Sequence, residues 1–456
     1  MAGPRLLPPE GELSSWLEAE GRAMHELATR LYPIPRSITG DGVRETLGVL
    51  REAVPLEVHE VPTGTPVFDW TVPKEWNVRE AWIRDPDGRK VVDFADHTLH
   101  LVGYSVPVHE RLPLARLRER LHTLPEQPDL IPYRTSYYSE SWGFCLSHRA
   151  LESLERQDRG GEYEVRIDAT LEHGALTYGE LAIPGEGDRE VLLSCHVCHP
   201  ALANDNLSGI AVTLHLARRL LAAAREAPLR YGYRFLWLPG TIGAIAWLAT
   251  NREAAARVAH GLVAANLGDS GPLHYKRSRR GDAEIDRAVE HLLGAAGEPF
   301  AVEDFVPYGY DERQYGSPGF DLAVGSLTRT PWGRYPEYHT SGDDLTLIRP
   351  ENLAGSLAAY LRVMDLLERN RSYRNLNPFC EPQLGRRGLY SAIGGGAGEQ
   401  VKQPQLALLW VLNQSDGRHD LLAIAERSGL PFDRVHEAAH ALLGAGLLEP
   451  ADEGVP

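Results

Sequence analysis

Residues 192–209, LLSCHVCHPALANDNLSG, bring together five side chains that can do chemistry: Cys195, His196, Cys198, His199 and Asp205. Three kinds of site use such residues. The pattern C-x-x-C-H is typical of c-type haem attachment, and a C-x-x-C pair is typical of a redox-active dithiol. Histidines with a nearby aspartate are instead ligands for zinc or a similar divalent ion.

The rest of the chain disfavours haem and redox chemistry at this motif. The N-terminal stretch MAGPRLLPPEGELSSWLEAEG has no apolar signal region, and no run of eighteen apolar residues follows, so we expect a cytoplasmic protein. A c-type haem is attached outside the cytoplasm. A redox pair favours the start of a helix, where its thiolate is stabilised, whereas a proline follows His199 here.

Charge and composition narrow the class of partner. The chain has 456 residues, 43% of them hydrophobic and 24% charged, which is typical of a globular protein with a large core. Its formal net charge is −16. Nucleic acids and anionic membranes are bound by basic surfaces, so we expect neither as a partner and expect a small molecule instead.

Strands and helices alternate along the central part of the chain, which predicts an α/β fold with a mostly parallel sheet flanked by helices. The expected strands cover residues 190–196, 233–238, 261–267 and 321–327. The expected helices cover residues 11–31, 41–53, 205–224, 241–257, 282–295 and 350–369. Residues 162–185 are predicted to form a hairpin. In such sheets ligands bind at the carboxyl ends of the strands.

The chain divides into three predicted domains. Residues 1–65 and 161–375 form the α/β core, and residues 66–160, rich in prolines and aromatic residues, form a mainly β insertion. Residues 385–450 resemble a winged helix-turn-helix. Residues 401–456 contain four Lys or Arg and eight Asp or Glu, so we favour a packing or homo-oligomerisation module over DNA binding.

The predicted strand ends bring four candidate metal ligands to one edge of the sheet. His196 ends one strand and Asp205 begins the following helix, although an aspartate there could equally serve as the helix cap. Asp269 follows the strand 261–267, and His339 lies in the loop after the strand 321–327. This convergence favours a metal site.

Several motifs together resemble a known family: FDWTVPKEWNVREAWIRDPDG, IPYRTSYYSESWGFCLS, CHPALANDNLSG and EYHTSGDDL. They are similar to zinc-dependent aminopeptidases of the phosphorylase/hydrolase-like fold, in particular bacterial aminopeptidase-like proteins with a β insertion and a C-terminal winged helix. The resemblance implies one or two zinc ions. It assigns His196, Asp205 and Asp269 to one ion, and Asp205 with His339 to another.

Two positions depart from that family. Cys198 stands where the family has an aspartate that orients the first histidine, and we interpret His199 as a support for the loop rather than as an extra ligand. Gly240, in Pro239-Gly240-Thr241, stands where the wider family has the glutamate that acts as general base, next to a ligand glutamate. A general base contributes about 10²–10⁴-fold, so hydrolysis by the usual route is impaired.

Three readings remain open. The first is a metal-dependent hydrolase of a small peptide or aminoacyl amide, in which a substitute carboxylate such as Glu312 or Glu337 acts as base. In the resembling peptidases the loop matching YGYDERQYGSPGF borders the metal, so Asp311, Arg313 and Gln314 would hold the substrate. The second is an acyl or aminoacyl transferase in a biosynthetic pathway, which needs no such base. The third is a catalytically silent binding or scaffold protein.

Overall fold

The computed structural model describes residues 6–389 and 403–451, and the chain separates into two compact units. Among the described residues, the larger unit contains residues 6–286 and 298–361, and the smaller one contains residues 287–297, 362–389 and 403–451.

The larger unit is built on an eight-stranded mixed sheet. In spatial order its strands are β1 (Glu57–Pro62), β10 (Ala175–Ile183), β12 (Gly232–Leu238), β11 (Glu190–His196), β13 (Val258–Ala264), β16 (Val324–Thr328), β14 (Leu273–Lys276) and β15 (Phe300–Glu303). The four strands from β12 to β16 are parallel to one another, and β1, β10 and β14 introduce antiparallel pairs. The expected α/β class with a mostly parallel centre is confirmed.

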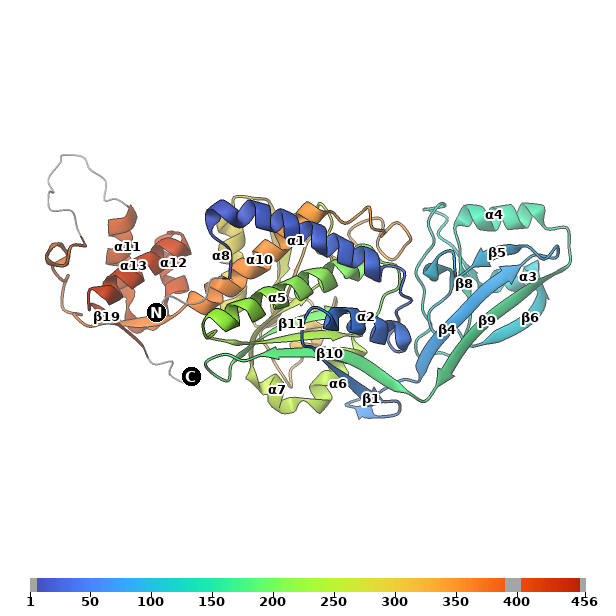
Figure 1. Cartoon of the computed structure of the whole chain (residues 1–456), viewed down its shortest axis with the longest axis horizontal. Helices are drawn as coiled ribbons and strands as arrows, with labels where there is room; N and C mark the ends of the chain where they lie inside the picture. Colours follow the sequence, from blue (N-terminus) through green and yellow to red (C-terminus); the bar gives the residue numbers. More distant parts are fainter. Residues whose placement is uncertain (1–5, 390–402, 452–456) are drawn as a thin grey trace. The chain divides into compact units, whose positions relative to one another are not determined.

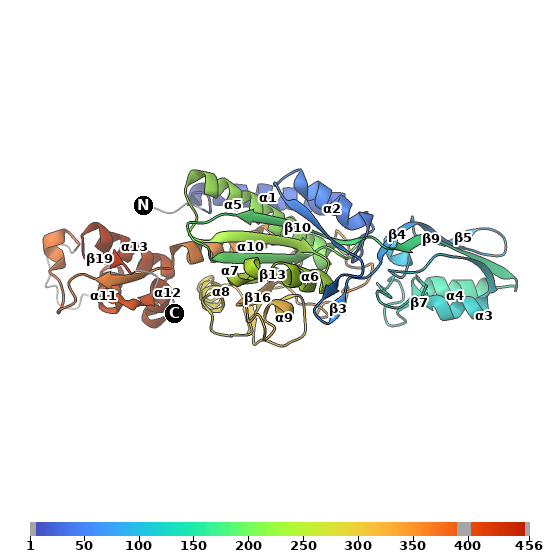
Figure 2. The same ribbon diagram turned by 90° about the horizontal axis from the view of Figure 1, so that it is seen from below.

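Helices cover both faces of this sheet. Figures 1 and 2 show α1 (Glu10–Leu31), α2 (Asp41–Arg51) and α5 (Gly209–Glu226) on one face, with α6 (Ile242–Thr250) and α7 (Arg252–Arg257) on the other. Because both faces are covered, β12 (GYRFLWL) is buried at every position. Its one charged side chain, Arg234, forms ion pairs with Glu180 and Glu190. Helices α8 (Glu284–Ala295) and α10 (Pro350–Arg369) each contribute residues to both units, and the short helix α9 (Glu312–Tyr315) belongs to the larger one.

Two local expectations were wrong. The predicted hairpin at 162–185 is not one, because β9 (Glu162–Glu172) pairs with β4 (Glu75–Arg84) and β6 (Val108–Pro113) of a separate sheet while β10 pairs with β1 and β12. The chain therefore passes from one sheet to the other between β9 and β10 (Figure 1). The predicted helix 241–257 is interrupted at Asn251, whose backbone is non-helical, and so forms α6 and α7.

The second sheet contains four antiparallel strands in the order β5 (Lys90–Asp93), β4 (Glu75–Arg84), β9 and β6 (Val108–Pro113). Short elements accompany it: β2 (Pro66–Val67), β3 (Trp70–Thr71), α3 (Leu114–Leu117), β7 (Leu121–His122), β8 (Phe144–Cys145) and α4 (His148–Gln157). The exact limits predicted for this insertion, residues 66–160, stay a prediction.

The smaller unit contains the winged helix-turn-helix. Its helices are α11 (Gln403–Gln414), α12 (Leu421–Ser428) and α13 (Phe432–Gly444), and its sheet is β18 (Asp416–Asp420), β17 (Ser372–Asn375) and β19 (Leu448–Pro450). The predicted turn between the last two helices is present: Gly429 has a positive φ of 68°, and α13 starts directly after Pro431. Part of the predicted span 385–450, residues 390–402, lies outside the described residues.

Helix α5 is the central helix of the larger unit. Together with the π-type turn that precedes it, it spans residues 203–226, the one helix among the described residues long and apolar enough to cross a membrane. However, 72% of its most apolar window is buried inside the fold, and a buried core helix passes the same test.

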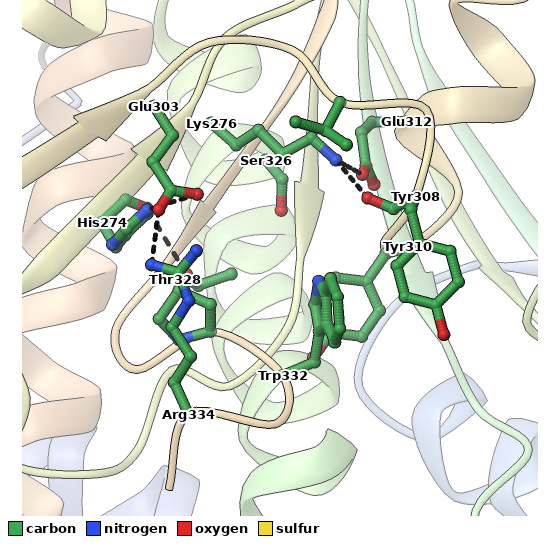
Figure 3. A pocket seen from close by; sticks show the side chains of 12 residues that line it. His274, Lys276, Glu303, Tyr308, Tyr310, Glu312, Ser326, Thr328, Trp332 and Arg334 are labelled. Atoms are coloured by element: carbon green, nitrogen blue, oxygen red, sulfur yellow. Dashed lines mark hydrogen bonds and ion pairs between the residues drawn. The ribbon is translucent and has the colours of Figure 1, made fainter.

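Strands β14, β15 and β16, with the loop that follows β15, line a cavity of about 200 Å³ that we call the polar cavity (Figure 3). Its walls carry basic, acidic and aromatic side chains.

The close packing of α1 against the start of α10 supports the loop before α10, which carries His339. A Cβ at Gly21 would clash with the Pro350 carbonyl oxygen, and His25 Nε2 lies 3.1 Å from the Leu345 oxygen. We therefore predict that Gly21→Ala lowers the free energy of unfolding by about 1–3 kcal/mol.

Gly11→Ala is the matched control in the same helix, because a Cβ there has no described atom within 4 Å. It should be neutral or stabilising by up to about 1 kcal/mol, since alanine favours helix over glycine. Urea unfolding followed by fluorescence measures both; equal effects of the two substitutions would contradict the packing argument.

Candidate metal centre and adjoining cavity

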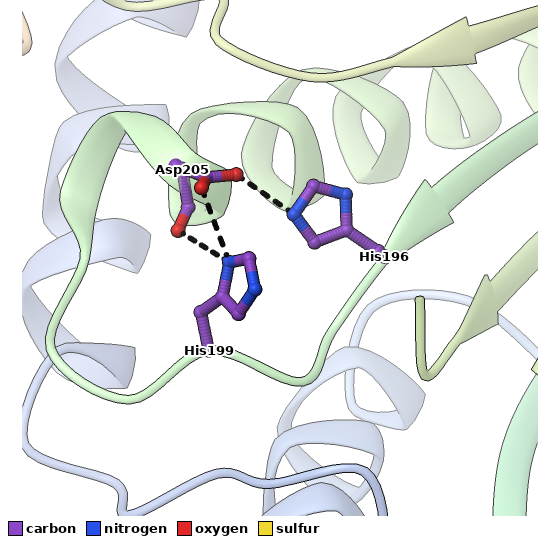
Figure 4. Close-up of side chains that lie close together, drawn as sticks. All are labelled: His196, His199 and Asp205. Carbon is purple, nitrogen blue, oxygen red and sulfur yellow. Dashed lines mark hydrogen bonds and ion pairs between the residues drawn. The ribbon is translucent and has the colours of Figure 1, made fainter. Parts of the chain in front are cut away.

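Three histidines surround one buried carboxylate at the carboxyl edge of the main sheet. His196 Nε2 lies 2.8 Å from Asp205 Oδ1, and His199 Nδ1 lies 3.3 Å from Asp205 Oδ2 (Figure 4). His339 Nε2 lies 3.1 Å from the same Oδ2. The ligand atoms of His196, His199 and Asp205 all lie within 4.8 Å of one another, which is the spacing that one metal ion needs.

Different elements position these side chains. His196 is the last residue of β11, and Asp205 lies in the π-type turn η3 (Ala203–Ser208). Asp205 has non-helical backbone angles, φ −109° and ψ 77°, and α5 starts only at Gly209. The alternative role of Asp205 as a helix cap is therefore wrong, as is the predicted helix start at 205.

The carboxylate of Asp343 fixes the turn that carries Asp205. It accepts hydrogen bonds from the backbone amides of Asn204, at 2.5 Å, and Asp205, at 3.0 Å. Burial raises the pKa of Asp343 to about 7. The hydrogen bond from the Asn204 amide lowers this pKa, and the negative charge of Asp205 raises it. Asp205 itself is fully buried, so this backbone anchoring determines where its oxygens point.

The electrostatics of the cluster concentrate on Asp205. Burial opposes its ionisation, but the charge of His199 and the hydrogen bond from His196 hold the pKa of Asp205 well below its usual range. Burial also disfavours the charged form of His199, yet the Asp205 carboxylate raises the pKa of His199 well above normal. Because a metal ligates neutral imidazole, an ion bound here displaces that proton.

Two buried atoms indicate that the cluster fits a metal ion. Asp205 Oδ2 and His339 Nε2 form an ion pair 3.1 Å long, but neither atom makes a well-formed hydrogen bond among the described residues. Buried polar atoms nearly always make such hydrogen bonds, so this carboxylate oxygen and imidazole nitrogen, beside further nitrogen ligands, are suited to bind a metal ion. A divalent ion such as zinc satisfies nitrogen and carboxylate donors together.

The structure places the other predicted ligand elsewhere. Neither Asp269 nor His339 belongs to the set whose ligand atoms all lie within 4.8 Å of one another. The Asp269 carboxylate accepts hydrogen bonds from Asn204 Nδ2 at 2.9 Å, Gly271 N at 2.7 Å and Thr330 Oγ1 at 2.6 Å. His199, which we interpreted as a loop support, is a member of the cluster. Asp269 as a zinc ligand stays a prediction.

Aromatic rings enclose the three histidines, at positions that the pattern of strands and helices did not predict. Tyr310 stacks on His196 with ring centroids 5.3 Å apart, and Tyr338 stacks on His339 at 4.0 Å. Tyr133, from the insertion, contacts His199 at 5.2 Å and His339 at 5.0 Å, both edge to face. Such rings exclude water and limit the rotation of the imidazoles.

A cavity of about 200 Å³, which we call the metal cavity, opens beside the cluster. It is lined by the three histidines and also by Cys198, Gly240 and Asp311. Glu337, Arg313 and Gln314 do not line it, and Glu312 lines the neighbouring polar cavity. The predicted roles of Glu312, Arg313 and Gln314 stay predictions.

The Gly240 position has room for a side chain. A Cβ there would lie 3.4 Å from Cys198 Sγ and 3.5 Å from His196 Cβ, both ordinary contacts. The backbone amide of Gly240 donates to Cys198 Sγ at 3.3 Å, and the amide of Thr241 donates to Asp311 Oδ1 at 2.7 Å. Asp311 therefore stands beside the point where the family's base begins.

Comparisons with known proteins agree with this architecture. Residues 25–370 match the family described as Domain of unknown function (DUF4910), and residues 371–450 match a winged helix-turn-helix family. A Clostridium acetobutylicum protein, provisionally described as a polysaccharide biosynthesis protein with an aminopeptidase-like domain, is 48% identical over 429 residues, covering 94% of this chain and 96% of that protein.

Solved structures show the same fold. A crystal structure from Clostridium acetobutylicum, provisionally described as a peptidase, aligns with a TM-score of 0.89 at 46% identity and covers 96% of this chain and 99% of its own. The zinc aminopeptidase of Bacillus subtilis aligns with a TM-score of 0.54 at 12% identity, over 75% of this chain and 94% of its own. The second likeness shows the shared aminopeptidase-like fold alone.

The cluster predicts which substitutions remove zinc. Changes to outer partners of a metal site weaken binding by about 10–100-fold, so Asp205→Asn and His199→Ala should each weaken it by more than that. If Asp269 only supports Asn204 and Thr330, as its hydrogen bonds suggest, Asp269→Asn should keep the affinity within about tenfold. Zinc titration of metal-depleted protein measures all three.

His109→Ala is the control, because that histidine is exposed and distant from the cluster in the sequence. An Asp269→Asn variant that loses zinc while His199→Ala retains it would restore the ligand set expected from the sequence.

Proposed function

Since the chain belongs to the DUF4910 family and has an aminopeptidase-like fold, we propose that it is a zinc-dependent hydrolase acting on the amide bond of a small peptide or aminoacyl compound. The observation that carries the proposal is the pair of buried atoms Asp205 Oδ2 and His339 Nε2, which lack a well-formed hydrogen bond among the described residues and lie beside a cavity that the Asp311 carboxyl group also lines. The biosynthetic description of the Clostridium relative supports a substrate from a biosynthetic pathway.

A zinc ion bound by His196, His199, Asp205 and His339 would polarise the scissile carbonyl and lower the pKa of water. The chain itself must supply the base that accepts the proton. Asp311 fits this role because it lines the metal cavity and is 3% exposed. Burial raises the pKa of Asp311 to about 7, partly offset by the hydrogen bond from Thr241 N, so the carboxyl group can exchange protons near neutral pH.

Glu312 is less suited to act as the base. Its Oε1 accepts a hydrogen bond from Lys276 Nζ at 2.6 Å, and it lines the polar cavity. Within the acidic pair we therefore assign the proton transfer to Asp311 and leave Glu312 for contact with the substrate. The aromatic rings of Tyr310 and Tyr338 restrict water beside the histidines, which strengthens the electrostatic effect of nearby charges.

Gly240 favours a second candidate, transfer of an acyl or aminoacyl group to an amine. In that reaction the amine brings its own basicity, so the carboxylate missing at Gly240 is not needed. A panel of dipeptides and aminoacyl amides, assayed with zinc and with amine acceptors, separates the two: free acid indicates hydrolysis, and an amide product indicates transfer.

The first catalytic prediction concerns pH. If ionised Asp311 is the base, the rate must rise with pH and reach half its plateau near pH 7, since the carboxyl group is protonated below that value. Asp311→Asn should lower kcat by about 10²–10⁴-fold and remove this rising limb. Stopped assays from pH 5 to pH 9 measure this pH dependence. Glu312→Gln, at the next residue, is the control and should keep the rise of the rate with pH.

The second catalytic prediction concerns Gly240. A glutamate there starts from a position with ordinary contacts, beside both His196 and Asp311, so Gly240→Glu should fold normally. In the Asp311→Asn background, Gly240→Glu should recover at least about tenfold of the lost rate, because it returns a carboxylate to the metal cavity. Gly240→Gln is the uncharged control.

Equal rates for the Glu and Gln variants would refute the role of a carboxylate at this edge. If no variant hydrolyses the substrates although zinc is bound, group transfer or a binding role would be favoured.

A further inference from the structure

The polar cavity adjoins the metal cavity. Tyr308, Tyr310 and Trp332 line both, and each cavity has a volume of about 200 Å³. The consecutive acids Asp311 and Glu312 line different cavities, Asp311 the metal cavity and Glu312 the polar one. A substrate with its reacting bond beside the histidines can therefore extend one substituent past these rings into the polar cavity.

Glu312 and Lys276 line the polar cavity, and each can make one more hydrogen bond. Glu312 is 1% exposed, and its Oε2 has no hydrogen-bond partner among the described residues. Lys276 Nζ donates to Glu312 Oε1 at 2.6 Å and to Tyr308 O at 2.7 Å, so one of its three ammonium hydrogens remains (Figure 3). An acceptor and a donor thus lie side by side, and a buried acceptor without a partner destabilises the site until a ligand binds it.

The charges of the cavity cancel. Lys276 pairs with Glu312, and Arg334 Nη1 pairs with Glu303 Oε1 at 2.5 Å. Burial lowers the pKa of His274, despite the nearby Glu303 carboxylate, so this imidazole is neutral at pH 7. A charged ligand would be buried without a counter-charge, which is costly, so the cavity favours a neutral ligand.

The ligand must also match the aromatic side. Tyr308 and Trp332 pack at 73° with ring centroids 4.8 Å apart, and both rings line the cavity together with its polar side chains. An aliphatic side chain would leave Glu312 Oε2 unsatisfied. A hydroxyl group both donates and accepts, so adjacent hydroxyls satisfy Glu312 and Lys276 together. A ring with one apolar face and several hydroxyls meets all of these requirements.

We infer that the polar cavity is a subsite for a neutral, polyhydroxylated ring, a hexose or N-acetylated hexosamine, joined to the group whose amide bond lies in the metal cavity. The position of that amide bond rests on the proposed function. The recognition of the ring rests only on the residues of the polar cavity.

Binding rather than turnover tests this inference. Glucose and N-acetylglucosamine, titrated into the full-length protein and followed by saturation-transfer NMR and calorimetry, should show saturable binding. Glucuronic acid and glucosamine, which carry a charge, should bind at least about tenfold more weakly, since the cavity has no free counter-charge. Leucinamide and glutamine amide are the competing amino-acid probes.

Two variants locate the bound sugar. Glu312→Gln and Trp332→Leu should each weaken sugar binding by about tenfold or more. Trp16→Leu, a tryptophan in α1 that lines neither cavity, should leave it unchanged. Melting curves identify any variant that fails to fold, and the preference for neutral sugars is measured on the unchanged protein.

Each result decides one point. The inference is overturned if no sugar saturates, if charged sugars bind as well as neutral ones, if folded Glu312→Gln and Trp332→Leu proteins bind sugar normally, or if only the amino-acid amides compete for the cavity. Sugar binding with this specificity, in a protein that hydrolyses nothing, would sustain the subsite while refuting the proposed hydrolysis.

Discussion

One buried carboxylate, that of Asp205, sets the arrangement of the site. A charge without solvent is tolerated only where other groups compensate it, and here the compensation comes from three imidazoles around its two oxygens. The backbone amides of Asn204 and Asp205 donate to Asp343, so the turn cannot rotate the carboxylate away. Asp343 and His339 belong to the same loop, which therefore supplies both an anchor and a candidate ligand.

The insertion holds the other side of that loop. Tyr133 N donates to the His339 oxygen at 2.8 Å, and Ser341 exchanges hydrogen bonds with Ile131, from Ser341 N to the Ile131 oxygen and from Ile131 N to Ser341 Oγ. These contacts amount to a short strand-like pairing, and they place the Tyr133 ring against both His199 and His339. The β insertion thus contributes to the geometry of the histidines, so it is part of the site and not merely attached to the core.

The sequence predicts the positions of those site residues that depend on the order of the strands. His196, Asp205 and His339 follow from the rule that parallel strands present their carboxyl ends to one edge, and the structure brings these three together. Asp269 could not be placed this way, because β13 ends at Ala264 and the five residues up to Asp269 carry it to Asn204 and Thr330. Strand order could not place His199 beside Asp205 either, because the position of His199 depends on the path of a loop.

The loop before α9 places two consecutive acidic residues in two different cavities. Asp311 accepts from the Thr241 amide and is held at the metal cavity, whereas Glu312, the next residue, pairs with Lys276 in the polar cavity. Gly309 makes this division possible, because a Cβ at that position would lie 2.7 Å from Glu312 Oε1 and 3.2 Å from Trp332 Nε1, and its φ is +144°. A side chain there would collide with residues that line the polar cavity. The glycine therefore lets the loop pass close to Glu312 and Trp332, so that consecutive residues of one loop line both cavities.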